Sequence, residues 1–241
     1  MFKKFFTLFK IARILAKSEA LEIIYKIHQP PIIIKILLKV VGFSFKKSTK
    51  EFENLSDEEK LCNSIQSMGT SFIKLGQFLS TRPDIIGDKL AISLEKLQDR
   101  VPAFDKSDAE KILKLNIGEE NFNQILNFSD PIAAASIAQV HKAQLNDNGT
   151  IKDVAIKILR PNIKKIFNEQ IDALMLFAYL IESLVKKSQR LRLVEVVFLL
   201  KQITNHEMDL RFEAAAANEY AENTKNDIGF NVPKIYWNYT S

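Results

Sequence analysis

The chain has 241 residues, of which 46% are hydrophobic and 26% charged, and it contains seven Gly and seven Pro. This composition excludes disordered, collagen-like and low-complexity proteins, and the length is sufficient for one large core or two small ones. Its single cysteine, Cys62, excludes an internal disulfide and a cysteine-rich zinc site, and it favours a reducing, intracellular setting.

The positive charge is concentrated at the N-terminus. Residues 1–50 contain eleven Lys or Arg and two acidic residues, whereas the net charge of the whole chain is +5. On a helix, Lys3, Lys10 and Lys17 would share one face, opposite an apolar face rich in phenylalanine. The pattern predicts that residues 1–47 form a basic amphipathic helical head, with helices at about 2–28 and 32–43.

Residues 1–43 of this head are expected to contact an anionic membrane surface. Two alternatives stay open: the head packs on the rest of the chain, or it binds nucleic acid, for which no recognition motif follows. We therefore expect no nucleic-acid partner. We also expect no transmembrane helix, because the apolar stretch 32–43 is interrupted by Lys35 and Lys39 and is shorter than the roughly 20 residues that a span requires.

The next segment is predicted to be helical, at about 57–80, 88–98, 107–115 and 119–126. Ser56 and Glu59 have the spacing of a capping box at the start of the first of these helices. Its apolar residues recur every three or four positions, which predicts a buried seam. Gly69 and Gly76 lie two turns apart and predict that another element approaches closely.

A β-hairpin is predicted at about 132–160, with turn-forming residues at Asn146–Gly149. On its second strand, Ala155, Lys157 and Leu159 share one face, and Val154, Ile156 and Ile158 share the other. The sequence Val-Ala-Ile-Lys is typical of the kinase strand whose lysine reaches the nucleotide phosphates. By pattern alone, an exposed lysine on an edge strand is an equal interpretation.

Two further helices are predicted at about 163–187 and 193–224. The second carries Glu207, Asp209 and Glu213, which could supply the carboxylate partner that such a lysine needs. Four alanines, 214–217, would allow close packing against a sheet. The alternative is a solvated acidic patch paired with Arg211. Helices, a small strand region and then more helices predict an α+β fold.

Five segments, in this order along the chain, resemble the UbiB/ADCK family of atypical kinase-like proteins linked to ubiquinone biosynthesis. They are Phe72–Asp84, Leu97–Phe104, Ala133–His141, Val154–Lys157 and Glu207–Glu213. The resemblance covers about residues 55–237. It implies a protein-kinase-like N-lobe, built of a small antiparallel sheet plus long helices, with an N-terminal helical extension. The implied domains are the head at 1–47, a helical extension at 55–127 and an incomplete N-lobe at 128–241.

The resemblance also implies a nucleotide site for ATP with Mg. In it, an alanine-rich loop at Ala133–Ser136 replaces the glycine-rich loop of kinases, and Lys157 contacts phosphate while forming an ion pair with Glu213. The implied nucleotide-binding residues are Ile132, Ala133, Ala134, Ala135, Ser136, Ile137, Ala138, Gln139, Val140, Ala155 and Lys157. Further residues would belong to an inhibitory extension that folds across the active site: Lys74, Gly76, Gln77, Glu207 and Asp209. By pattern alone, Lys74 and Gln77 are ordinary surface residues.

Kinase chemistry also needs a catalytic-loop Asp, an Asn and a second Asp for magnesium. None of the three histidines begins such a loop, and Asp227–Gly229 has no catalytic loop before it, so it is expected to be a surface turn. We expect no catalytic residue and no metal site in this chain, and the C-lobe to be absent.

Whether the chain alone is an enzyme is left open. The main interpretation is a truncated or split UbiB-type kinase or ATPase that acts in ubiquinone biosynthesis and needs a C-lobe chain for ATP turnover. Its partners would be that C-lobe chain or ubiquinone-biosynthesis proteins. The alternative is a noncatalytic relic or a scaffold that binds membranes and partners. The implied location is peripheral, on the cytoplasmic face of the inner membrane, or on the matrix side if the protein is organellar.

Overall fold

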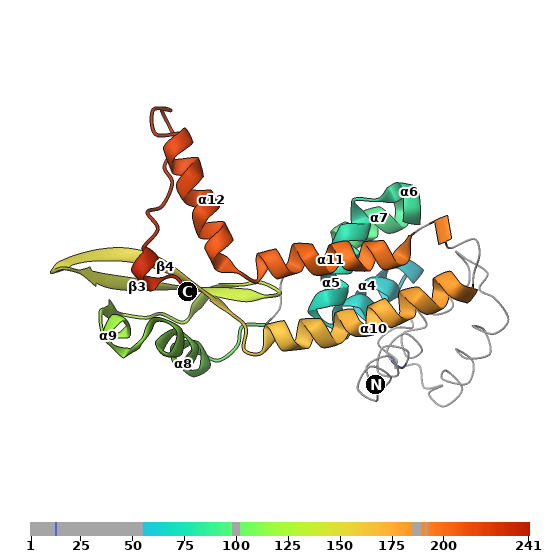
Figure 1. The fold of residues 1–241 in the computed structure, drawn as a ribbon, viewed down its shortest axis with the longest axis horizontal. Coiled ribbons are helices and arrows are strands. Elements are labelled where there is room, and N and C mark those ends of the chain that lie inside the picture. The colour runs from blue at the N-terminus through green and yellow to red at the C-terminus, as the bar shows by residue number, and fades with distance from the viewer. Residues whose placement is uncertain (1–12, 14–54, 98–101, 185–188, 191) are drawn as a thin grey trace. The chain divides into compact units, whose positions relative to one another are not determined.

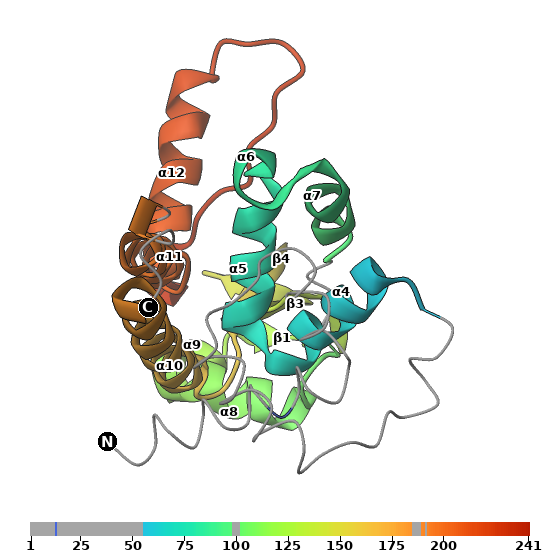
Figure 2. The same ribbon diagram turned by 90° about the vertical axis from the view of Figure 1, so that its right-hand side faces the viewer.

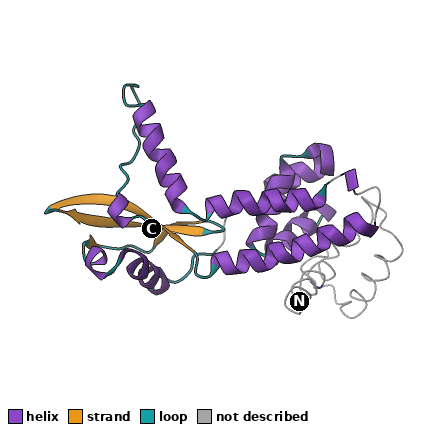
Figure 3. Cartoon of the chain, viewed as in Figure 1, coloured by secondary structure: helices purple, strands orange, loops and turns teal. Residues whose placement is uncertain are grey.

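The computed structural model describes residues 13, 55–97, 102–184, 189–190 and 192–241. The chain divides into two compact units, of which the helical unit contains 1–98 and 165–201 and the sheet unit contains 99–164 and 202–241. Both are described below by themselves. The described elements confirm the predicted α+β class, with many helices and one small antiparallel sheet (Figure 3). Apart from Arg13, the predicted head lies outside the described residues.

The helical unit contains four consecutive helices: α4 (Asp57–Met68), α5 (Thr70–Ser80), α6 (Pro83–Ile86) and α7 (Asp88–Glu95). It also contains most of α10 (Ile163–Leu184) and the first part of α11 (Leu193–Glu207). Helix α5 packs against α4 and α7 (Figure 2). The predicted capping box is confirmed, since Ser56 N donates to Glu59 Oε2 at 2.9 Å and Glu59 N to Ser56 Oγ at 3.2 Å. Hydrogen bonding from Ser56, first of all from its backbone N, lowers the pKa of the Glu59 carboxyl.

The prediction of one continuous helix at 57–80 is wrong, because the helix breaks at Gly69. That residue has φ +105°, a conformation that favours glycine. The side-chain amide of Gln170, on α10, bridges the break: its Oε1 accepts from Ser71 N and its Nε2 donates to Met68 O, both at 3.1 Å. The Gln170 amide thereby supplies partners for helix-end groups that a break leaves unsatisfied.

The predicted close approach at Gly76 is confirmed. A Cβ atom at this position would lie 2.3 Å from Leu97 Cδ1, so the end of the α7 segment packs directly on the α5 backbone. Leu97 is 2% exposed and Phe72, one turn before Gly76, is 6% exposed. Six apolar residues make up the predicted seam: Leu61, Met68 and Phe72 are buried, and Ile65, Leu75 and Leu79 are half-buried.

The sheet unit contains four antiparallel strands: β1 (Ile125–Leu126), β2 (Pro131–Ala134), β3 (Ala138–Asp147) and β4 (Thr150–Leu159). Strand β3 is central, with β1 and β2 along one edge and β4 along the other. Helix α8 (Lys106–Ile117) packs on one face through Ala109 and Leu113, which form a core with Ile158. The short helix α9 (Glu119–Phe122) follows α8 (Figure 1).

The predicted helix at 119–126 is wrong in its second half. It ends at Phe122, and Ile125 pairs with Leu145 of β3 instead. The reason is packing, because Ile125 joins the core beneath the sheet while Leu126 is 41% exposed. Successive side chains of a strand point to opposite faces, so two strand residues suffice to bury Ile125 and expose Leu126.

The hairpin prediction is confirmed, with β2 as an additional strand at its start. Asn148 and Gly149 have φ +52° and +84°, as a two-residue type I′ turn requires. The two predicted faces of β4 are also confirmed. Ile158 is 4% exposed on the α8 side, whereas Lys157, on the other side, is exposed.

The predicted helix at 193–224 is interrupted near its middle. Helix α11 ends at Glu207, and α12 (Leu210–Asn223) begins after Asp209, whose carboxylate accepts a hydrogen bond from Arg211 N as an N-cap. The buried side chain of Met208 lies at the break. Of the four alanines, only Ala214 is buried.

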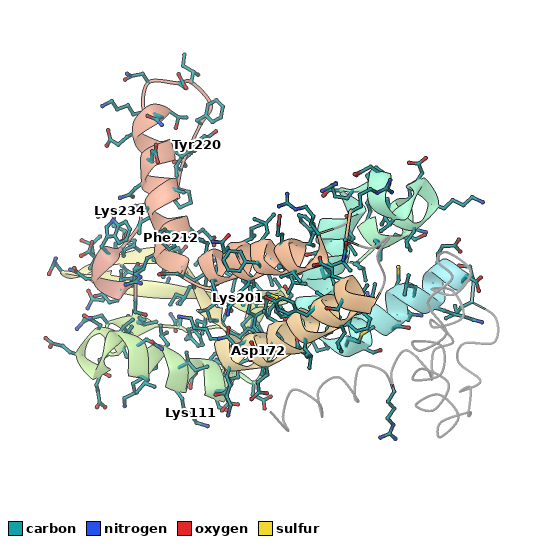
Figure 4. The ribbon with its side chains drawn as sticks, turned by 45° about the vertical axis from the view of Figure 1, so that its right-hand side comes forward. Lys111, Asp172, Lys201, Phe212, Tyr220 and Lys234 are labelled. Atoms are coloured by element: carbon teal, nitrogen blue, oxygen red, sulfur yellow. The ribbon has the colours of Figure 1, made fainter. Side chains whose placement is uncertain are left out.

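Helix α12 exposes its aromatic side chains: Phe212 is 55% and Tyr220 49% exposed (Figure 4). The predicted turn at Asp227–Gly229 is confirmed, and Ile228 projects fully into solvent. After it, the 3-10 helix η3 (Trp237–Tyr239) lies near α9, since Asn121 Nδ2 donates to Asn238 O at 3.2 Å. None of the helices in the described ranges has the length and apolarity needed to span a membrane.

Candidate functional site

Lys157 and Glu213 form the ion pair at the centre of the candidate site. Lys157 Nζ donates to Glu213 Oε2 at 2.6 Å, joining β4 to the first turn of α12 across 56 positions of sequence. The two side chains are 38% and 62% exposed. Exposed pairs add only about 0–1 kcal/mol to stability. Stabilisation of the fold therefore does not account for this pair. Its main effect is on position, because the Glu213 carboxylate keeps the Lys157 ammonium beside α12.

The sheet register places an alanine of β2 in the same row as this lysine. Ala133 pairs with Val140 on β3, and Val140 pairs with Lys157 on β4. Residues directly opposite each other in antiparallel strands project to the same face. That face is the one opposite α8, because the neighbouring Ile158 packs against α8. Helix α12 contacts this face through Glu213, and Figure 1 shows α8 and α12 on different sides of the strands. The sheet thus brings the alanine-rich segment and the ion pair together.

The alanine-rich segment, Ala133–Ser136, forms the end of β2 and the start of the turn to β3. Ala135 N donates to Ala138 O at 2.8 Å, which closes the turn. The first residue of the segment, Ala133, and the preceding Ile132 are exposed, and Ala134 and Ala135 are half-buried. The following residues, Ser136, Ile137, Ala138 and Gln139, are buried. Short side chains in this turn leave its backbone accessible to a ligand at the exposed end.

Arg160 is a residue of this site that the sequence analysis missed. Its Nε and Nη2 atoms donate to the carbonyl oxygen of Ala135 at 3.0 and 2.8 Å, and its backbone N donates to Ile137 O at 2.9 Å. Partial burial lowers the pKa of its guanidinium, but arginine stays charged in proteins. The available signal was an Arg-Pro pair directly after the Val-Ala-Ile-Lys strand.

Gln139, one of the predicted nucleotide-binding residues, has its side chain occupied elsewhere. It is 1% exposed and its amide pairs with the backbone of Phe104, accepting from Phe104 N at 2.9 Å and donating to Phe104 O at 3.2 Å. The amide nitrogen also lies 2.9 Å from Nε2 of the buried His141. His141 Nδ1 is 2.9 Å from Ser129 O, so Nδ1 donates and Nε2 accepts. Gln139 is thus buried in the sheet unit, between Ala134 of β2 and Ile158 of β4, and its part in nucleotide binding stays a prediction.

Glu207 and Asp209 precede α12. The Asp209 carboxylate is held by Arg211, with Nε to Oδ1 at 2.8 Å and Nη2 to Oδ2 at 2.6 Å. These hydrogen bonds lower the pKa of Asp209 to about 2, with a smaller effect of Lys164. The sequence left open that the acidic patch pairs with Arg211. That pairing is confirmed for Asp209. Glu213 pairs with Lys157 instead.

Lys74, Gly76 and Gln77 lie on α5 in the helical unit. Gln77 Nε2 donates to Leu97 O at 3.2 Å, beside the contact between Leu97 and Gly76. Within this unit, Gly76 and Gln77 therefore hold the end of the α7 segment against α5. The inhibitory role stays a prediction for all five residues.

The sheet-unit site is suited to holding phosphate. It presents one fixed ammonium group and a turn with small side chains, and lysine is a common phosphate ligand in nucleotide sites. Within the described parts of the chain, no three His, Cys, Asp or Glu side chains come together as a group that could hold a metal ion.

Comparisons with known proteins agree with this geometry. The ABC1 atypical kinase-like domain matches residues 96–241. A protein of Marinobacter nauticus named probable protein kinase UbiB is 39% identical over 187 residues, which are 77% of this chain and 34% of the relative. A protein of Pseudomonas fluorescens strain SBW25 with the same name is 31% identical over 233 residues, 96% of this chain and 42% of the relative. No solved structure matches significantly.

The chain thus spans between a third and about two fifths of the length of these relatives. The domain match begins one residue before the Leu97–Phe104 segment and includes the alanine-rich turn, β4 and α12. On this match, the chain belongs to the ABC1 atypical kinase-like family.

Proposed function

We propose that the sheet unit holds the phosphates of ATP in a UbiB-type atypical kinase or ATPase, and that turnover needs a C-terminal lobe. The observation that carries this proposal is the 2.6 Å contact between Lys157 and Glu213. In kinases, the corresponding lysine–glutamate pair must be formed for the lysine to reach the phosphates. The relatives' name, probable protein kinase UbiB, supports the same assignment.

In this proposal, each group has one task. Lys157 neutralises phosphate charge, and Glu213 keeps its ammonium in place in the absence of nucleotide. The turn at Ala133–Ser136 lies against the phosphates through its backbone, because alanine side chains permit a close approach. Mg would accompany the ATP, and its ligands are proposed to come from the C-terminal lobe together with the base.

We further propose that the whole protein acts in ubiquinone biosynthesis, as a peripheral protein on the inner membrane. The family membership and the relatives' names support the first part of this proposal. The excess of basic residues at 1–50 supports the second part. Ubiquinone-biosynthesis proteins are the partners proposed.

The test combines the 241-residue chain with the C-terminal lobe of the Marinobacter relative and measures ATP hydrolysis in the presence of Mg. We expect no turnover by the chain alone and measurable turnover by the combination. Lys157→Ala should reduce that turnover at least about 100-fold, since it removes a transition-state contact worth several kcal/mol. Lys152→Ala removes an exposed charge from the same strand and should leave turnover unchanged.

Two results would contradict the proposal. Turnover by the chain alone would show that no C-terminal lobe is needed. Turnover by the combination that survives Lys157→Ala would show that the ion pair has no part in the reaction. Circular dichroism of each variant confirms that it is folded.

A further inference from the structure

Arg160 contacts the alanine-rich turn through the carbonyl oxygen of Ala135. Two of its nitrogens, Nε and Nη2, donate to Ala135 O at 3.0 and 2.8 Å. Hydrogen bonds from a charged donor are about twice as strong as those between neutral groups. With the bond from Arg160 N to Ile137 O at 2.9 Å, the residue after β4 holds the turn at two carbonyls.

Fixing this carbonyl fixes the peptide group that contains it. The chain has no cis peptide bond in its described residues. In a trans peptide the N–H points opposite to the C=O. The direction of Ala135 O therefore determines the direction of the next N–H, at Ser136, and with it the backbone course between β2 and β3.

The guanidinium is itself held from a second side. Its centre lies 5.8 Å from the centroid of the Phe104 ring, a cation–π arrangement. Phe104 is fixed in turn by the Gln139 amide, which pairs with both its N and its O. Gln139, Phe104 and Arg160 thus form a continuous series of contacts that ends at Ala135.

We infer that Arg160 is a positioning residue that orients the Ala133–Ser136 turn for binding the phosphates of a nucleotide. This inference rests on the proposed function and adds a determinant of phosphate affinity to it. Arg160 is three residues after Lys157, directly after the end of β4. The end of this strand thus carries the lysine of the site and also, through Arg160, holds the turn in position.

Two measurements on the 241-residue chain test the inference. The first is hydrogen exchange of the Ala135 amide without nucleotide, because this amide donates to Ala138 O only while the turn keeps its shape. Arg160→Ala should accelerate its exchange about tenfold, as expected for the loss of charged hydrogen bonds. Arg160→Lys retains the charge and a single donor nitrogen in place of two, and it should restore part of the protection.

The second measurement compares the affinities for ATP and adenosine. Loss of orientation in the turn should weaken ATP binding about tenfold and leave adenosine binding unchanged, so that the ratio of the two affinities falls in Arg160→Ala. A general loss of structure would lower both affinities together. Lys152→Ala removes an exposed positive charge from β4 and should change neither affinity nor Ala135 exchange.

The outcomes separate the inference from the function on which it rests. Unchanged Ala135 exchange in a folded Arg160→Ala protein overturns the positioning role, whatever the nucleotide result. If exchange accelerates but the ratio of ATP to adenosine affinity stays constant, the link to phosphate is overturned. If the unaltered chain binds neither ligand, phosphate holding by this chain fails, and the exchange rate alone decides whether Arg160 positions the turn. Should Arg160→Ala not fold, Arg160→Lys serves for both measurements.

Discussion

The carboxylates of the 207–213 segment are separated by the break between α11 and α12. As part of one helix, Asp209 and Glu213 would share a face, and either could have been the partner of Lys157. With Asp209 as the N-cap of α12, its carboxylate is bound by Arg211, and Glu213 alone reaches β4. A local capping interaction thus selects the residue that completes the candidate site.

The Asp209–Arg211 pair makes a prediction about titration. The pKa of Asp209 is about 2, below its usual 3.8, chiefly because the Arg211 side chain donates two hydrogen bonds to the carboxylate. A depressed pKa stabilises the fold above pH about 4, and that contribution is lost as the pH falls through about 2. In Arg211→Ala, NMR titration of the carboxyl carbon should find the midpoint raised toward 3.8.

Arg82 provides the control for this titration, because it forms a similar exposed pair with Asp84. Arg82→Ala should leave the Asp209 midpoint unchanged. A midpoint near 3.8 in the unaltered chain would show that the Arg211 hydrogen bonds are not maintained in solution.

Gln139 makes a prediction about stability. Gln139→Ala leaves the backbone of Phe104 and Nε2 of His141 without the amide that pairs with them. An unsatisfied buried polar group costs about 1–3 kcal/mol, so the free energy of unfolding should fall by at least about 1 kcal/mol in urea denaturation. The side chain of Gln144, on the same strand, bonds to the exposed side chains of Asn127 and Asp153 and to no buried group. Its replacement by alanine should cost no more than about 0.5 kcal/mol.

At the residue scale, motif order predicted Lys157 and Glu213, and the structure pairs them. Spacing could not predict the roles of Gln139 and Arg160. Both depend on backbone groups, at Phe104 and Ala135, that lie 35 and 25 residues away. Hydrogen bonds to a distant backbone leave no pattern in the residues that accept them, so only the fold shows them.

At the scale of elements, the sequence predicted which segments are helical better than where the helices end. The apolar repeat continues without a gap through Gly69, because α4 and α5 bury the same face on both sides of the break. At the break, backbone groups of Met68 and Ser71 bond to the Gln170 amide on α10, about 100 residues away. The break at Met208 is local instead, because the Asp209 carboxylate caps the start of α12 by accepting from Arg211 N.

The break at Gly69 can be tested by substitution. Gly69→Ala would place a Cβ atom 2.6 Å from Gln170 Nε2, in addition to the strain of φ +105°. Gly87 also has a positive φ, +81°, but nothing lies within 4 Å of its Cβ position. Gly87→Ala should therefore cost the backbone strain alone, about 1–3 kcal/mol, and Gly69→Ala more. Urea unfolding of both variants measures the difference.

The same comparison identifies the role of Gln170. In a Gln170→Ala background the additional cost of Gly69→Ala should disappear, because the atom that it would displace is gone. Equal costs for Gly69→Ala and Gly87→Ala in the unaltered background would show that the Gln170 amide moves aside freely and does not determine the break.

At the scale of the whole molecule, charge is distributed very unevenly. The first 50 residues have eleven Lys or Arg and two acidic residues, so the remainder of the chain is slightly acidic. Lysines near an anionic bilayer contribute about 1 kcal/mol each, an attraction that salt weakens over a Debye length of about 10 Å at 0.1 M. A slightly acidic body gives no such attraction, so membrane binding should depend on the N-terminal segment.

This dependence can be measured by flotation with vesicles. We expect the chain to bind vesicles that contain anionic phospholipid, with an affinity that falls as salt increases, and to bind zwitterionic vesicles weakly. Replacing Lys3, Lys4, Lys10 and Lys17 by Gln should lower the affinity for anionic vesicles at least about 100-fold. Replacing four lysines of the described region, Lys106, Lys111, Lys114 and Lys152, removes the same charge and should have a much smaller effect. Equal binding to both kinds of vesicle, or equal loss in the two variants, would contradict a membrane contact made by the basic N-terminal segment.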